Sequence, residues 1–185
     1  MLKSIILIIC LIVIICSNLF ANESESKPVS FNLGFQAAFG IPEDNYLKWG
    51  LGDNYEEHKN TAWLNFIRAG IYTDLLFNFN KHYSLGPEVG IYLFAIDTCS
   101  EFRLFFDIPI NIIFRISYKR FFLAPYGGLY LMNWDFKEWI QLYDAGGKIG
   151  FYIPKRYLRL YADAAYVFGE YNMLRIALGF NVQLY

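Results

Sequence analysis

Apolar and polar residues alternate with a period of two in eight segments that follow residue 29. This alternation predicts strands with two different faces. In one such segment, Leu104 and Ile110 share a face opposite Arg103 and Asp107. The predicted strands lie near 30–41, 63–77, 82–95, 102–116, 121–132, 143–153, 157–168 and 173–184. The fifth has the least distinct faces, because Pro125 and several glycines interrupt it.

The connections between these strands alternate in length and character. Short, mostly basic turns are expected at 78–81, 118–120 and 154–156. The remaining connections fall at 42–62, 96–101, 133–142 and 169–172, of which the first and third are long. Short turns at one end and longer loops at the other are typical of an outer-membrane barrel. The sequence therefore predicts an all-β fold, an eight-stranded antiparallel up-and-down transmembrane β-barrel with both termini in the periplasm.

The first residues have the layout of a secretory signal peptide. Lys3 precedes an apolar run over 5–15, and a more polar stretch leads to Ala21, after which we expect cleavage. A retained anchor helix is the alternative. After cleavage Cys99 is the one remaining cysteine, which excludes an intrachain disulfide. The expected division is a signal peptide at 1–21, a short flexible leader at 22–29 and a barrel domain at 30–185.

Composition narrows the class of protein. Hydrophobic residues make up 56% of the 185-residue chain and charged residues 18%, yet no stretch is long enough for a transmembrane helix. The net charge of −1 argues against a nucleic-acid partner, which requires a basic surface. Once the signal peptide is removed, a closed barrel is the remaining way to satisfy backbone groups in hydrocarbon.

The polar face of the strands carries six basic and five acidic residues together with many glycines and tyrosines. A water-exposed surface would carry more Lys, Glu and Thr and fewer glycines, so this face is expected to line a crowded lumen. Unpaired buried charges are costly, so the charges should pair and fill the lumen rather than leave an open pore. The predicted lumen network is Arg68, Asp74, Glu88, Arg103, Asp107, Arg115, Asp144, Lys148, Arg159, Asp163 and Arg175.

The apolar face is expected to contact outer-membrane lipid. Aromatic residues near the strand ends fit the interfacial girdles of such barrels. An aromatic-rich chain also places aromatic residues at many positions without such a role. The expected girdle residues are Trp63, Tyr83, Phe102, Tyr118, Tyr143, Tyr157 and Phe168.

Several segments of the chain resemble those of small outer-membrane β-barrel proteins of the porin, or OmpA/OmpX-like, family. They are LGPEVG at 85–90, DIPINI at 107–112, PYGG at 125–128 and DAGGKIG at 144–150. The resemblance spans most of the mature chain. It implies an eight-stranded barrel in the outer membrane of a diderm bacterium.

The resemblance also implies a partner for the last strand. Such proteins end in an aromatic residue that shares its face with the preceding alternate apolar residues, and the barrel-insertion machinery recognises this pattern. Tyr185 is terminal and aromatic, but Phe180, Val182 and Leu184 lie one residue out of phase with it. Either the register shifts at the end of the strand or the signal is read loosely.

No catalytic constellation, cofactor motif or metal-ligand spacing stands out, so we expect no enzyme and no cofactor. Lipid A deacylases and palmitoyltransferases are outer-membrane barrels that resemble this protein in size, and they need a His near a Ser at the outer rim. His58 with Ser100 is the pairing the sequence offers, although two solvated loop residues are the simpler interpretation. A cation site is the second candidate, although a solvated acidic loop is again the simpler interpretation. The residues that could bind the cation are His58, Glu43, Asp44, Asp53, Glu56 and Glu57.

The leading functional hypothesis is a non-enzymatic outer-membrane barrel with a structural or adhesin-like role. Aromatic residues anchor interfaces, so those of the long loops are expected to form a contact surface for an extracellular ligand. Alternatively, these aromatic residues rest on the outer leaflet of the membrane. A lipid A-modifying enzyme that uses His58 and a narrow channel remain open. The expected contact residues are Tyr46, Trp49, Trp134, Phe136 and Trp139.

Overall fold

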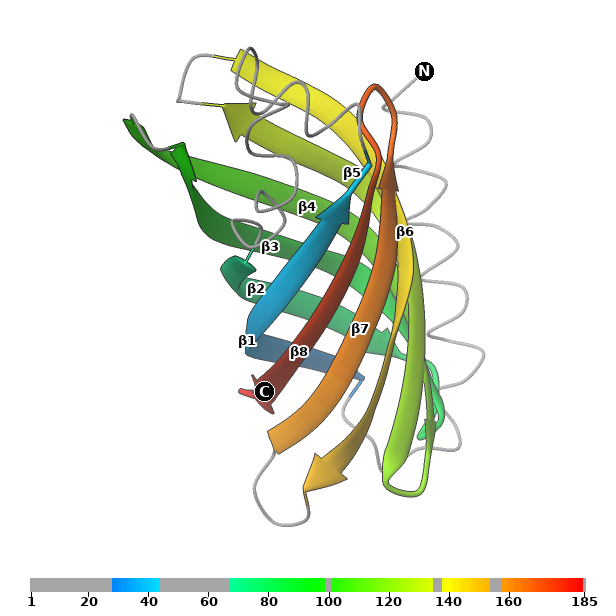
Figure 1. Ribbon diagram of the computed structural model, residues 1–185. Helices are drawn as coiled ribbons and strands as arrows, with labels where there is room; N and C mark the ends of the chain where they lie inside the picture. Colours follow the sequence, from blue (N-terminus) through cyan, green and yellow to red (C-terminus); the bar gives the residue numbers. More distant parts are fainter. Residues whose placement is uncertain (1–27, 44–66, 99–100, 135–137, 154–157, 185) are drawn as a thin grey trace, which may run out of the picture.

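Eight antiparallel strands form one closed barrel in the computed structural model of the protein (Figure 1). Each strand pairs with its neighbour in the sequence, and β8 closes the barrel by pairing with β1. The structure describes residues 28–43, 67–98, 101–134, 138–153 and 158–184. The predicted eight-stranded, up-and-down antiparallel barrel is therefore confirmed. The proposed signal peptide and all but the end of the leader lie outside the described residues.

The strands are 11 to 18 residues long, longer than the 9–11 or so that a tilted strand needs to cross a bilayer. They are β1 (Val29–Pro42), β2 (Ile67–Asn78), β3 (Tyr83–Thr98), β4 (Glu101–Tyr118), β5 (Phe121–Trp134), β6 (Glu138–Ile153), β7 (Leu158–Phe168) and β8 (Met173–Gln183).

Two predicted loops are shorter than expected. The connection predicted at 133–142 is mostly strand, because β5 continues to Trp134 and β6 begins at Glu138. Likewise β3 and β4 pair as far as Thr98 and Glu101. The alternation did not predict this first part of β6, because on the N-terminal side of Tyr143 the apolar residues face inward and a polar residue faces outward. Ile140 and Leu142 face inward there, while Gln141 faces outward.

The two ends of the barrel differ in their connections. At one end, here called the turn end, lie residues 79–82 and 119–120, the end of β6 at Ile153 and the start of β7 at Leu158, together with Val29 and Gln183. At the other, the loop end, β1, β3 and β5 end, β2, β4 and β6 begin, and residues 169–172 join β7 to β8. In Figure 1 the green hairpin of β4 and β5 turns at the lower, turn end, while the orange hairpin of β7 and β8 turns at the loop end.

Side chains alternate between the lumen and the outer wall through most of the described part of each strand. In β7, positions from Arg159 to Val167 are alternately buried and exposed or half-buried. Outward residues such as Ile149 and Leu178 are 62% and 69% exposed. Among the outward strand positions whose side chains the structure describes, none is Asp, Glu, Lys or Arg. The predicted two-faced strands are thus confirmed there, whereas Arg103 and Leu104 lie outside the described side chains.

Across these same described residues, no helix is both long and apolar enough to cross a bilayer.

Candidate functional site

The lumen contains five basic and five acidic side chains in the described part of the barrel. All are at most 6% exposed, so their charges must be balanced within the protein. Ten of the eleven predicted network residues are therefore placed inside the barrel, and Arg103 lies outside the described side chains. The ten are Arg68, Asp74, Glu88, Asp107, Arg115, Asp144, Lys148, Arg159, Asp163 and Arg175.

Arg68 of β2 and Asp107 of β4 form a pair in the loop-end half of the lumen. The Arg68 Nε atom lies 2.9 Å from Asp107 Oδ2, and neither side chain is exposed. The Tyr130 hydroxyl, from β5, donates to the same carboxylate oxygen. The pair therefore links β2, β4 and β5 through the interior.

Arg175 of β8 serves two carboxylates at once. Its Nη2 atom lies 3.4 Å from Asp144 Oδ2 and 3.6 Å from Asp163 Oδ2. The same nitrogen donates to the Tyr126 hydroxyl at 2.7 Å, and that hydroxyl donates to Asp163 Oδ1 at 2.7 Å. Gln36 Nε2 donates to the other Asp163 oxygen at 2.8 Å. This cluster holds β1 and β5–β8 together.

Lys148 of β6 reaches across the lumen to Glu88 of β3, and its ammonium group donates to the Glu88 carboxylate. The ammonium nitrogen also lies 4.3 Å from the centre of the Tyr72 ring and 5.3 Å from that of Tyr161. An ammonium group over an aromatic face is stabilised, more strongly when water is excluded. This pair therefore links opposite walls of the barrel.

In the turn-end half of the lumen, positive charge is less fully balanced by carboxylates. Arg115 Nη2 lies 3.2 Å from Asp74 Oδ2, and Asn32 donates its side-chain N–H to Asp74 Oδ1. Arg159 donates to Asn32 Oδ1 and to Gln183 Oε1, both at 2.8 Å. Among the described residues, Arg159 has no carboxylate partner. It is a buried cation held by neutral amides.

Inward glycines provide the space for the tyrosine rings. A Cβ atom built on Gly34 would lie 2.1 Å from the Tyr72 ring, and one on Gly179 would lie 2.2 Å from the Tyr161 hydroxyl. Gly34 faces Tyr72, and Gly179 faces Tyr161, directly across the strand pair. The glycines on the polar face thus allow a narrow lumen to hold large polar side chains.

Apolar side chains close the lumen near the loop end, which the sequence analysis did not identify. They share the inward phase of buried polar residues on the same strands, as Val167 does with Asp163 and Met132 does with Tyr130. That phase was the available signal. Each is at most 1% exposed; the group, here called the loop-end layer, is Met132, Leu142, Val167 and Met173.

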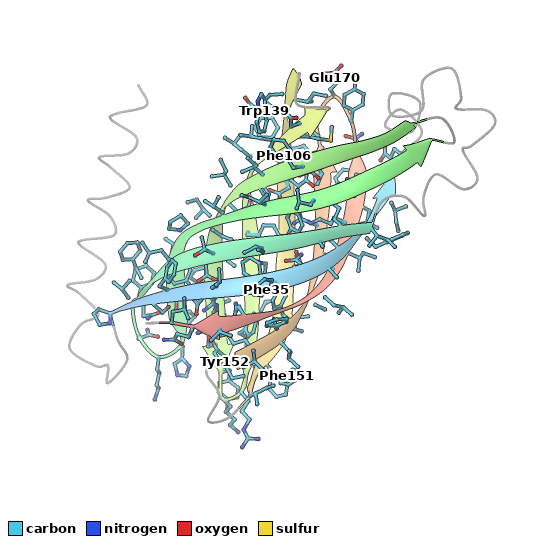
Figure 2. All side chains as sticks on the ribbon, turned by 90° about the vertical axis from the view of Figure 1, so that its left-hand side faces the viewer. Phe35, Phe106, Trp139, Phe151, Tyr152 and Glu170 are labelled. Carbon is cyan, nitrogen blue, oxygen red and sulfur yellow. The ribbon has the colours of Figure 1, made fainter. Side chains whose placement is uncertain are left out.

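Aromatic side chains gather at both ends of the outer wall. At the loop end, the ring centres of Tyr143 and Phe168 lie 5.9 Å apart, and those of Phe106 and Trp139 lie 5.2 Å apart. Figure 2 shows Phe106 and Trp139 near the loop end, and Phe151 near the turn end. Tyr143 and Phe151 are eight residues apart on β6, which is about 26 Å along the strand. A tilt of about 40° reduces this to about 20 Å along the barrel axis, comparable to the apolar band of about 25 Å in membrane barrels.

Four of the predicted girdle residues are described, and all four are exposed on the outer wall. They are Tyr83, Tyr118, Tyr143 and Phe168. The side chains of the remaining three predicted girdle residues, Trp63, Phe102 and Tyr157, lie outside the description.

The predicted loop contact surface is largely outside the described side chains, which exclude Tyr46, Trp49, Trp134 and Phe136. Trp139 is described and is 54% exposed, but it belongs to β6 rather than to a loop. Trp134 is likewise the last residue of β5. These two positions are corrected from loop to strand.

The predicted catalytic pair and cation site also fall mostly outside the description. These residues are His58, Ser100, Asp44, Asp53, Glu56 and Glu57. Within the described ranges, no group of three or more His, Cys, Asp or Glu side chains could hold a metal ion.

Glu43 is described, and it contacts the opposite side of the β1–β8 seam. Its carboxylate accepts hydrogen bonds from the Tyr166 hydroxyl and, at 3.1 Å, from Asn172 Nδ2. The Tyr166 hydrogen bond, reinforced by that from Asn172, lowers the pKa of Glu43. Glu43 therefore helps to hold the end of β1 against the β7–β8 connection.

The barrel is similar to solved structures of small outer-membrane barrels. For Neisserial surface protein A the TM-score is 0.50 at 9% identity, over 85% of this chain and 100% of that chain. For the N-terminal barrel domain of OprF from Pseudomonas aeruginosa the TM-score is 0.44 at 10% identity, over 81% and 96%. For Ail, the attachment invasion locus protein of Yersinia pestis, it is 0.46 at 11% identity, over 84% and 97%.

No family model matches the chain, and no curated protein matches it in sequence. The similarity to Neisserial surface protein A is structural and concerns the fold. The chain has the fold of the small eight-stranded outer-membrane β-barrels.

Proposed function

We propose that this protein is an integral outer-membrane barrel of a diderm bacterium, with a closed lumen and a structural or surface-contact role carried by its loop end. The distribution of charge supports the membrane assignment. The described lumen holds ten buried charged side chains, whereas the described outer wall holds none. A water-soluble barrel requires the opposite arrangement.

The packing of the lumen argues against a channel. Arg68 and Tyr130 are completely buried, and the residues of the loop-end layer are at most 1% exposed. The charged groups contact each other across the barrel, as Lys148 does with Glu88. A continuous aqueous path would require these ion pairs and apolar contacts to separate.

A closed lumen and a lipid-covered wall leave the two ends for contact with soluble partners. The loop end carries the longest connection, between Glu43 and Ile67. Trp139 is exposed beside this end and contacts Phe106 edge-to-face. Exposed aromatic side chains often anchor interfaces, which makes this end the better candidate for binding an extracellular ligand.

Epitope insertion in cells tests the proposed orientation. One epitope is placed within 44–66 at the loop end and a second, as the matched control, within 154–157 at the turn end. The loop-end epitope should be labelled by antibody on intact cells, and the turn-end epitope only after the outer membrane is permeabilised. Labelling of the turn-end epitope alone on intact cells would contradict the proposal.

Planar-bilayer recording tests the closed lumen separately. The folded protein should insert without producing conductance steps. Stable, voltage-independent steps from a purified sample would instead favour the channel.

A further inference from the structure

A polar cavity of about 410 Å³ opens at the turn end of the lumen. Its basic lining residues are Lys81, Arg115, Lys119 and Arg159, and none of its lining residues is acidic. Tyr152 forms part of the same wall and lies near the turn end in Figure 2. The cavity therefore combines positive charge with an opening towards solvent.

Arg159 is the side chain that distinguishes this cavity from the rest of the lumen. It is 3% exposed, and its ring contact is with Tyr152, whose centre lies 4.8 Å from the guanidinium carbon. Its two hydrogen bonds go to neutral amide oxygens, and its Nε atom has no partner. A buried guanidinium without an anion is costly unless a ligand supplies the charge.

Arg159 lacks a carboxylate partner because the lumen carboxylates are unevenly distributed among the basic residues. The described lumen has as many acidic as basic residues, but Arg175 lies near both Asp144 and Asp163. Arg159 consequently has none. Arg115 has Asp74 alone and also keeps an unpartnered, buried Nε atom. Positive charge is thus concentrated at the turn end.

We propose that the turn-end cavity binds a small phosphate-like oxyanion, with Arg159 as its main ligand. A guanidinium group donates several hydrogen bonds in a planar fork that matches the oxygens of a phosphate group. Arg115 would contribute its free Nε, and Lys81 and Lys119 would attract the anion from solvent. The phosphate is supplied either as a soluble ion or as a lipid headgroup at the membrane surface. The inference is independent of the surface role proposed for the loop end.

Binding is measured on the full folded protein in a phosphate-free glucoside or maltoside detergent. Inorganic phosphate is titrated at constant ionic strength, with chloride as the reference anion. Phosphate should raise the midpoint of thermal unfolding and broaden its own ³¹P NMR signal. In Arg159→Gln the affinity should fall at least tenfold, because the main ligand is gone. This variant leaves no buried carboxylate unpaired, so it should still fold.

Arg120→Gln is the matched control, since Arg120 is an exposed residue at the same end but does not line the cavity. The affinity of the Arg120→Gln variant for phosphate should stay within twofold of that of the wild type. The double variant Lys81→Gln and Lys119→Gln, at exposed turn positions, should bind about threefold more weakly.

The source of the phosphate is distinguished by repeating the titration with phosphatidylglycerol mixed into the micelles. Stabilisation by free phosphate identifies a soluble ligand, and stabilisation by the lipid alone identifies a headgroup. Either result supports the site if Arg159→Gln lowers the affinity at least tenfold. Binding by neither, or equal binding by the wild type and Arg159→Gln, would overturn it.

Discussion

Lys148 and Glu88 illustrate what the lumen demands of individual residues. They lie on opposite walls and are nearly inaccessible to water. Removing one partner of a buried ion pair typically costs about 3–5 kcal/mol, whereas replacing both by apolar residues is often neutral. The cost therefore comes from the charge left alone, not from the loss of the pair itself.

Lys148→Met should lower the free energy of unfolding by about 3–5 kcal/mol, because Glu88 then remains buried and uncompensated. The double variant Lys148→Met and Glu88→Leu should recover most of this loss. Urea unfolding of the refolded protein in lipid vesicles measures both. Equal losses in the single and double variants would show that the pair does not act as described.

Gly34 and Tyr72 are matched by size and not by charge, because the Tyr72 ring occupies the space that a side chain at position 34 would need. Gly34→Ala should destabilise the barrel by about 1–3 kcal/mol, because its Cβ would overlap the Tyr72 ring. Gly147→Ala is the control, since the nearest atom to its Cβ would be 3.9 Å away. Urea unfolding should separate the two variants. In a Tyr72→Ala background Gly34→Ala should lose most of its cost, whereas the effect of Gly147→Ala should stay the same. Equal stability of Gly34→Ala and Gly147→Ala would contradict this account.

At the scale of one element, β6 passes through two environments. Ile149 faces outward between the aromatic bands, whereas Gln141 faces outward beyond Tyr143. Ile149→Lys should cost up to about 2–4 kcal/mol, because Ile149 lies inside the apolar band, and Gln141→Lys about 0–1 kcal/mol at the interface. Folding yield in vesicles, followed by the mobility of unboiled samples on gels, distinguishes them. Similar yields for both variants would contradict the proposed membrane boundary.

Glu43 makes the end of β1 sensitive to pH. Because its pKa is lowered in the folded state, the ionised form stabilises this end at neutral pH, and the contribution is lost as pH falls through that lowered pKa, below the ordinary glutamate value of about 4.3. The Glu43 amide donates to the Asn172 carbonyl at 3.0 Å, and its protection from hydrogen exchange should drop over that range. In Glu43→Gln the protection, corrected for intrinsic exchange, should not change with pH. Unchanged protection in the wild type would refute this role.

The elements were more predictable from the sequence than the interactions between them. A strict period of two identified all eight strands, because one face is apolar and the other polar through most of each strand. The ends of β5 and β6 were missed where that contrast inverts, as at Gln141 and Leu142. The loop-end layer was missed for a different reason. The alternation gives residues such as Val167 an inward phase, but it does not show that inward apolar residues of different strands meet in one layer.

Within the whole molecule, the partners of the lumen charges could not be predicted. Lys148 faces Asp163 across the β6–β7 pair, yet it binds Glu88 from the far wall. Which groups meet depends on barrel closure, on side-chain reach and on the space left by glycines, none of which is local in the sequence. The missing counter-charge of Arg159 therefore became visible only in the closed barrel.

The same closure determines which surface meets the solvent, and the central claim is that the outer wall meets lipid. Fluorescent labels at Ile112→Cys, Ile149→Cys and Leu178→Cys, in a Cys99→Ser background in lipid vesicles, test this most directly. Lys119→Cys at the turn end is the water-exposed control. Brominated acyl chains should quench the three wall labels strongly and the control weakly, and aqueous iodide should do the reverse. Wall labels quenched by iodide and unaffected by brominated lipid would contradict the account.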